Sequence, residues 1–123
     1  MHRSRMQDFR KVRAWQQNRE LTVLVYRITS KFPADERFGL TSQMRRAVVS
    51  IGANVAEGCG RNSDADKQRF LQMSFSSAVE LLHHMITSVD LGFLEQTEFD
   101  ELESKLTSVR RLTFGFIRKL KSS

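Results

Sequence analysis

Apolar residues between positions 40 and 57 recur every three or four residues, which is the spacing of one face of an α-helix. Small side chains flank this face and would let another helix approach closely. Gly58 and Gly60 follow, and we predict that they end the helix, because glycine reaches left-handed backbone dihedrals without a side-chain clash. The chain is therefore expected to pack amphipathic helices, and this one presents Leu40, Met44, Ala47, Val48, Ile51 and Val55.

Two further segments with helical spacing have clear boundaries in the sequence. The segment 10–32 ends before Pro33, because the residue that precedes a proline is pushed away from helical dihedrals. The segment 64–91 follows Ser63, a good N-cap, and stops at Gly92. Both are long enough to be the long helices of a bundle.

A fourth helix is expected from an N-cap at Thr97 to about residue 121, with acids in its first turns and bases in its last, as suits the helix dipole. Breaks near 33–39, 58–63 and 92–96 leave connections of about five to seven residues, which favour antiparallel neighbours. The sequence therefore predicts an all-α fold, an antiparallel up-down-up-down four-helix bundle in one domain spanning residues 1–123.

The composition fits a small domain that needs no disulfide or metal to fold. Cys59 is the single cysteine of the 123 residues, so it cannot form an internal disulfide, which fits a reducing compartment. No run of eighteen apolar residues is present, and the start of the chain lacks the apolar core of a secretory signal. We expect a cytoplasmic protein with no membrane span and a loose, basic N-terminal segment at residues 1–9.

The formal net charge of +6 is unevenly distributed. Positions 90–103 hold six acids and no base, whereas both ends of the chain are basic. A polarised basic surface favours an anionic partner such as RNA, DNA or an acidic protein. The candidate nucleic-acid-binding residues are Arg3, Arg5, Arg10, Lys11 and Arg13 near the N-terminus, and Arg118, Lys119 and Lys121 near the C-terminus.

Phe9 and Trp15 lie among the N-terminal cations, and two interpretations remain open. Aromatic rings interleaved with cations can stack on single-stranded bases while the cations hold phosphates. Alternatively, the basic segment is a solvated tail, and Trp15 packs in the core or at a subunit contact. The sequence contains no recognised RNA-binding motif that would decide between them.

Residues that support catalysis or metal binding are sparse. Glu80 and His83 form a Glu-x-x-His motif, a hallmark of di-metal carboxylate sites in helix bundles, and Glu80 shares a face with His84. Such a site needs a second copy of the motif, which the sequence lacks. Cys59 has no nearby base in sequence, and its glycine-rich surroundings follow a helix instead of the strand that precedes a phosphate-binding loop. We expect no metal site, no cofactor and no enzymatic activity.

Three motifs lie within residues 38–58: Phe-Gly-Leu-Thr-Ser-Gln, Arg-Arg-Ala and Asn-Val-Ala-Glu-Gly. This block resembles the signature of the bacterial four-helix-bundle proteins encoded in intervening sequences of 23S ribosomal RNA genes. The resemblance implies the same fold, but that family has no settled biochemical activity. The family commonly has proline at position 52, where this chain has glycine. Outside the block, the matching positions are Phe9, Trp15-Gln16, Tyr26, Phe32-Pro33, Phe70-Leu71 and Glu80-Leu81.

The charged positions Arg45, Glu57 and Glu80 also match the family, and they have two interpretations. They form either a surface for partners or a structural ion-pair network in which Arg45 pairs with Glu57 or Glu80. We predict the ion pairs, because partly buried charges in a bundle are normally paired.

The chain also resembles a structural relative of that family, the accessory variability determinant of diversity-generating retroelements. That protein forms a pentameric barrel and partners a reverse transcriptase and nucleic acid, so the resemblance implies a ring-like homo-oligomer, a pentamer. The apolar stripes are also wider than one bundle seam needs, and an exposed excess would be a sticky patch that a closed ring could bury. The excess positions are Trp15, Leu24, Phe70, Phe93, Phe114 and Ile117.

The sequence thus favours a non-enzymatic interaction protein that associates with nucleic acid as a ring-shaped homo-oligomer. The alternative is a protein–protein interaction or scaffold module without nucleic-acid binding.

Overall fold

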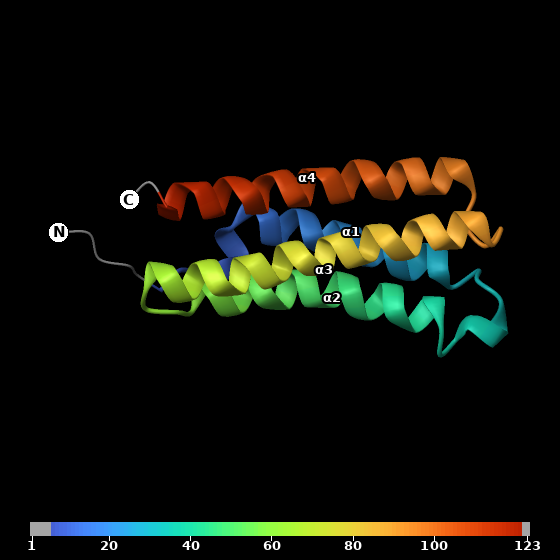
Figure 1. Ribbon diagram of the computed structural model, residues 1–123, viewed down its shortest axis with the longest axis horizontal. Helices are drawn as coiled ribbons and strands as arrows, with labels where there is room; N and C mark the ends of the chain where they lie inside the picture. Colours follow the sequence, from blue (N-terminus) through green and yellow to red (C-terminus); the bar gives the residue numbers. More distant parts are fainter. Residues whose placement is uncertain (1–5, 122–123) are drawn as a thin grey trace.

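The computed structural model describes residues 6–121, which form four long α-helices and two short 3-10 helices, with no strand in this range. Successive long helices run in opposite directions (Figure 1). The predicted all-α four-helix bundle is therefore confirmed. In chain order, the elements are η1 (Phe9–Lys11), α1 (Arg13–Thr29), η2 (Ala34–Glu36), α2 (Leu40–Cys59), α3 (Asp64–Asp90) and α4 (Gln96–Lys121).

The bundle core is continuous along most of its length. Helices α1 and α3 each pack against both α2 and α4. Met44, Leu81 and Leu102 are fully buried representatives of the main apolar cluster, to which all four helices contribute. Burying a side chain of this size contributes roughly 1.5–3 kcal/mol, so the shared core is the main source of stability. A smaller cluster near the start of α1 consists of Val55, Cys59, Leu71 and Ile117, with Phe9, Val12, Trp15, Phe116 and Leu120 against it.

Two helix boundaries follow the sequence prediction closely. The Ser63 hydroxyl accepts a hydrogen bond from the Asp66 amide at 3.1 Å, so Ser63 is the N-cap of α3. Gly92 has a φ of 79° and directly follows the last turn of α3, where Leu91 is the C-cap. Both signals act within a few residues, which explains why the sequence alone reveals them.

The sequence analysis predicts that Gly58 and Gly60 end α2 because glycine adopts left-handed dihedrals, and this reason is wrong. Gly58 is helical, and Gly60, the C-cap, has right-handed dihedrals of −86° and 0°. A Cβ on Gly58 would lie 3.3 Å from the Cβ of Phe70 and 3.4 Å from the carbonyl oxygen of Lys67. Gly58 therefore permits a close approach of α2 and α3, and the left-handed freedom of glycine is not used here.

Two other boundaries also differ from the prediction. Thr97 lies inside α4, which begins one residue earlier at Gln96. Just before it, the Glu98 carboxylate accepts the Glu95 amide at 3.1 Å, as the glutamate of a capping box reaches back to the residue before the helix. Helix α1 is shorter than 10–32, because Val12 is extended and separates it from η1.

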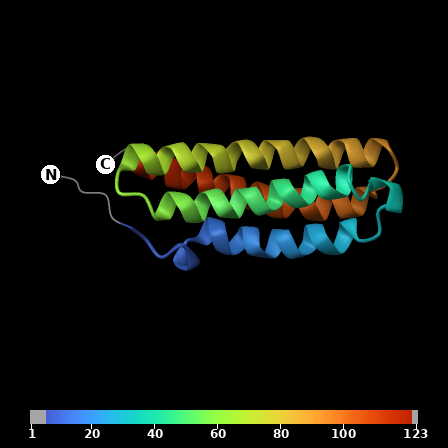
Figure 2. The same ribbon diagram turned by 90° about the horizontal axis from the view of Figure 1, so that it is seen from below.

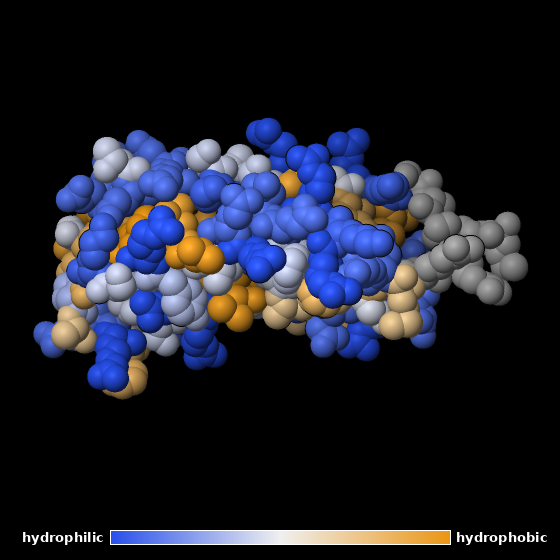
Figure 3. Space-filling view, turned by 180° about the vertical axis from the view of Figure 1, so that it is seen from behind, coloured by the Kyte–Doolittle hydropathy of each residue, from blue (hydrophilic) through white to orange (hydrophobic). Residues whose placement is uncertain are grey.

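The antiparallel order brings the start of α1 and the end of α4 to the same end of the rod, while the α1–α2 connection and η2 lie at the other end (Figures 1 and 2). Among the described residues, no helix is long and apolar enough to cross a membrane. The surface seen in Figure 3 is mostly hydrophilic, with separate hydrophobic patches between the charged side chains.

Candidate nucleic-acid interface

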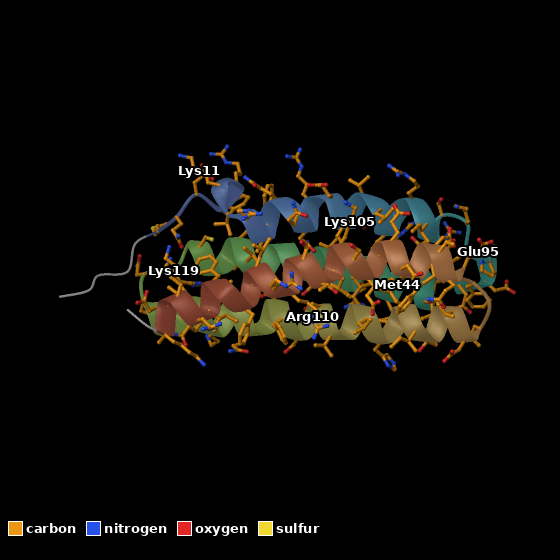
Figure 4. The ribbon with its side chains drawn as sticks, turned by 90° about the horizontal axis from the view of Figure 1, so that it is seen from above. Lys11, Met44, Glu95, Lys105, Arg110 and Lys119 are labelled. Carbon is orange, nitrogen blue, oxygen red and sulfur yellow. The ribbon has the colours of Figure 1, made fainter. Side chains whose placement is uncertain are left out.

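The predicted cations from the two ends of the chain lie at one end of the bundle. Figure 4 shows Lys11 and Lys119 there, one from the start of the described chain and the other from the last turns of α4. Arg3 and Arg5 lie outside the described residues. The remaining six, which we call the basic end, are all exposed: Arg10, Lys11, Arg13, Arg118, Lys119 and Lys121.

Arg10 of the basic end is engaged by a neighbouring carboxylate. The Arg10 guanidinium donates to both carboxylate oxygens of Asp8, through Nε at 2.9 Å and Nη2 at 3.0 Å. These hydrogen bonds lower the pKa of Asp8 and raise that of Arg10. Asp8 also accepts the backbone amide of Arg10 as the N-cap of η1. Arg10 thus helps to order the segment before α1, and its charge is partly neutralised.

The aromatic residues near these cations are packed against the protein. The rings of Phe9 and Trp15 meet edge to face with centroids 4.9 Å apart, and both pack on the smaller apolar cluster. The Arg19 guanidinium lies over the Trp15 ring, 5.9 Å from its centroid. This geometry supports the packing interpretation of Trp15 and gives the basic end the character of an electrostatic surface instead of a stacking platform.

A groove of about 750 Å³ runs between α1 and α4 next to the basic end. Its lining includes Arg19 and Arg27, but also Glu20 and Glu101. Lys105, which Figure 4 shows where α4 faces α1, is 3.4 Å from the Glu20 carboxylate. The lining also includes Arg10, so four cations accompany two acids and the groove keeps an excess of positive charge.

The opposite end of the bundle carries the acids of the sequence 90–103, and Glu95 marks it in Figure 4. There, Lys31 pairs with Glu98 at 3.2 Å across the ends of α1 and α4. The two ends of the bundle therefore differ in their charged side chains, although arginines at the start of α2 also lie at the end that carries these acids.

The structure places the signature charges differently from the predicted network. Arg45 does not reach Glu57, because twelve residues along one helix span about 18 Å. Arg45 instead turns towards α1, where its Nε donates to the Thr29 hydroxyl at 3.0 Å. Glu57 pairs with Arg61 at 3.0 Å, and Glu80 lies 3.3 Å from His84. The predicted ion pairs of Arg45 with Glu57 or Glu80 are therefore wrong. Each glutamate contacts a residue four positions later in the chain, and Arg45 contacts α1.

No group of three His, Cys, Asp or Glu side chains that could hold a metal ion occurs among residues 6–121. The rings of His83 and His84 contact each other with centroids 5.3 Å apart. Burial raises the pKa of the Cys59 thiol, and a protonated, buried thiol is a poor nucleophile. These residues therefore offer no catalytic constellation.

A buried lysine beside Cys59 escaped the sequence analysis. Lys67 on α3 is 2% exposed, and its ammonium donates to the carbonyl oxygen of Cys59 at 3.2 Å. Burial lowers the pKa of Lys67. Its donor satisfies one of the carbonyls at the end of α2, which have no partner within their own helix. The signal that could have revealed it is the position of Lys67, four residues before Leu71 and on the same apolar face of the helix.

The six positions predicted as an excess apolar surface do not behave alike. Leu24 and Ile117 are 5% and 3% exposed within the single chain, so they belong to its own core. Phe93 packs against the main cluster, whereas Phe114 is 51% exposed. Each helix of the bundle packs against two neighbours, so each needs a wide apolar stripe. Most of the apolar positions predicted to be in excess therefore pack inside the bundle.

Comparisons with known proteins agree with this fold. A family model described as 23S rRNA-intervening sequence protein matches residues 10–115. Among solved structures, six chains match, including a protein of unknown function from the S23 ribosomal protein family of Bacteroides thetaiotaomicron. That protein is 20% identical, with a TM-score of 0.76 over 85% of this chain and 97% of its own. No curated protein matches the chain.

Proposed function

The chain belongs to the 23S rRNA-intervening sequence protein family, and on that premise we propose that it is a non-enzymatic, cytoplasmic protein that associates with nucleic acid as a ring-shaped homo-oligomer. The observation that carries the proposal is the basic end, where cations from both ends of the chain converge. The convergence results from the even number of antiparallel helices. It places six exposed cations at one end of a chain whose net charge is +6.

Such a surface would bind the phosphate backbone with little sequence preference, because exposed cations position a nucleic acid but do not read its bases. Most of the binding free energy would come from released counterions, so affinity would fall steeply with salt. In a closed ring, every subunit repeats the same basic end by symmetry. Several weak contacts per subunit would then add up to one large positive field.

A pair of matched variants tests the proposal. Lys11→Gln/Arg13→Gln removes two charges from the basic end, and Arg27→Gln/Lys31→Gln removes two exposed charges near the other end of α1. Fluorescence anisotropy with labelled single-stranded RNA and DNA, measured across a salt series, gives affinity and slope. Each lost phosphate contact should reduce the slope of log affinity against log salt by about 0.7 for a single strand. We expect the first variant alone to show this reduction.

The alternative function, a scaffold without nucleic-acid binding, is favoured by one observation. Val49 on α2 and Met73 on α3 are 47% and 45% exposed, so apolar side chains remain open to a protein partner on both helices. A wild-type protein that binds neither RNA nor DNA at low salt would leave the scaffold function in place of the proposed one.

A further inference from the structure

Phe38 is the most exposed large hydrophobic side chain of the described residues, at 86%. It lies between η2 and α2, in a connection that hydrogen bonds hold in place. The Glu36 carboxylate accepts the Leu40 amide at 3.0 Å, and the Glu36 carbonyl accepts the Gly39 amide at 3.0 Å. A Cβ on Gly39 would lie 2.6 Å from the Glu36 carboxylate, so a larger residue there would displace the side chain that accepts the Leu40 amide. The aromatic ring is therefore presented to solvent by a fixed turn.

Beside Phe38, a groove of about 420 Å³ opens between the end of α1 and the start of α2. Its volume is within the range of small-ligand sites, about 300–1,000 Å³. Tyr26 and Val49, which are 42% and 47% exposed, contribute apolar surface to it. The end of α1 and the start of α2, which flank the groove, lie at the end of the bundle remote from the basic end (Figure 2).

Three arginines line this groove, and none of its lining residues is acidic. Arg45 lies over the Tyr26 ring at 4.5 Å and also donates to the Tyr26 carbonyl oxygen at 3.3 Å, so its position is fixed. Arg37 lies 5.6 Å from the centroid of the Phe38 ring. Arg46 is exposed. The site thus combines one open aromatic face with a cluster of positive charge.

We propose that this groove binds single-stranded nucleic acid, with a base stacked on Phe38 and the adjoining phosphates held by Arg37 and Arg46. Aromatic rings beside cations are the usual platform for single strands, because every base has a π-face and every linkage carries a negative charge. A two-fold contact with a second copy fits poorly, because it would bring the arginines of the two grooves together. The inference rests on the proposed nucleic-acid association, but it concerns a different surface.

The test uses the binding of a labelled six-nucleotide single-stranded RNA by the full chain at low salt. Phe38→Ala removes the ring, Phe38→Leu keeps an apolar side chain without a π-face, and Phe38→Trp restores one. We expect binding about tenfold weaker or more for Phe38→Ala, from the usual contribution of one stacked base. Phe38→Leu should remain weak, and Phe38→Trp should recover the affinity, with fluorescence quenched by the RNA.

Two control variants separate the groove from general effects. Leu91→Ala removes an exposed apolar side chain outside the groove, and Lys31→Gln removes one charge outside it. Both should bind like wild type, whereas Arg46→Gln should bind more weakly. Circular dichroism confirms that each variant is folded.

The possible results distinguish this inference from the proposed function. If Phe38→Ala and Arg46→Gln bind RNA like wild type, while Lys11→Gln/Arg13→Gln binds more weakly, the groove is not a binding site and the proposed function stands. Equal affinity of Phe38→Leu and wild type would overturn base stacking. Binding of a glutamate- and tyrosine-containing peptide at the groove, without RNA binding, would overturn both in favour of a protein partner.

Discussion

The side-chain amide of Asn18 donates a hydrogen bond to the carbonyl oxygen of Val48 at 3.0 Å, joining α1 to α2 inside the bundle. Asn18 is 3% exposed, and its partner carbonyl belongs to the turn of α2 that precedes Gly52. A Cβ on Gly52 would lie 2.8 Å from the Asn18 amide nitrogen. Gly52 thus provides the space in which the buried amide reaches the facing helix.

This relationship predicts a non-additive pair of substitutions. Gly52→Ala gains up to about 1 kcal/mol of helix propensity, but it displaces the Asn18 amide and leaves buried polar groups unpaired, at about 1–3 kcal/mol. We expect a net loss of stability in urea unfolding. In an Asn18→Ala background the amide is gone, so Gly52→Ala should be neutral or stabilising. Equal effects in the two backgrounds would show that Gly52 and Asn18 are independent.

Lys67 predicts a specific pH dependence of stability. Because burial lowers its pKa in the folded state, the unfolded chain binds more protons between that value and the ordinary lysine pKa of about 10.4. The free energy of unfolding should therefore rise with pH through this window. The raised pKa of Cys59 acts in the opposite direction above the ordinary thiol value of about 8.5, because the folded thiol keeps its proton.

Separating the two groups requires a Cys59→Ala background. There, urea unfolding between pH 7 and 10 should show the rise in stability, and Lys67→Met should abolish it. Lys11→Met, which alters an exposed lysine, serves as the control and should keep the rise. An identical pH profile with and without Lys67 would mean that its ammonium is not desolvated by folding.

The N-cap of α3 predicts a local stability effect. Ser63→Ala removes the acceptor for the Asp66 amide and should lower the free energy of unfolding by about 1 kcal/mol. Ser104→Ala, an exposed change within α4, should be neutral or slightly stabilising, because alanine has the higher helix propensity. Thermal or urea unfolding of both variants provides the comparison.

The proposed ring predicts a mass in solution five times that of the 14.3 kDa chain. Multi-angle light scattering at micromolar concentration measures it directly. Phe114→Asp should reduce the mass, because it places a charge on the one position of the six that is both aromatic and largely exposed. Ile86→Asp, an exposed position outside that set, should leave it unchanged. A monomeric wild-type protein would exclude the ring.

The fold was predictable from the sequence because its signals are local. Helical spacing, the Ser63 cap and the left-handed Gly92 each depend on a few consecutive residues. The roles of Gly58 and Gly52 depend on which residues of α3 and α1 pack against them. The sequence alone therefore does not reveal why glycine occupies these positions. Sequence patterns therefore identify helices better than the contacts between them.

The candidate site was predictable only in part, for a related reason. The basic end follows from charge position and helix direction, both of which the sequence supplies. The partners of Arg45 depend on how α2 is rotated against α1, which decides between Thr29 and the predicted carboxylates. The exposure of Phe38 depends on the turn made by Glu36 and Gly39, because an aromatic residue in a family motif would ordinarily be assigned to the core.

The shared location of the first and last described helical turns makes this bundle a candidate for circular permutation. A flexible linker could join the chain near Met6 to the end of α4, and new ends could open at Gly92, in the α3–α4 connection at the opposite end. Such a permutant would keep every cation in place while moving both termini to the opposite pole. An affinity tag or fused reporter attached at these new ends would lie away from the basic end.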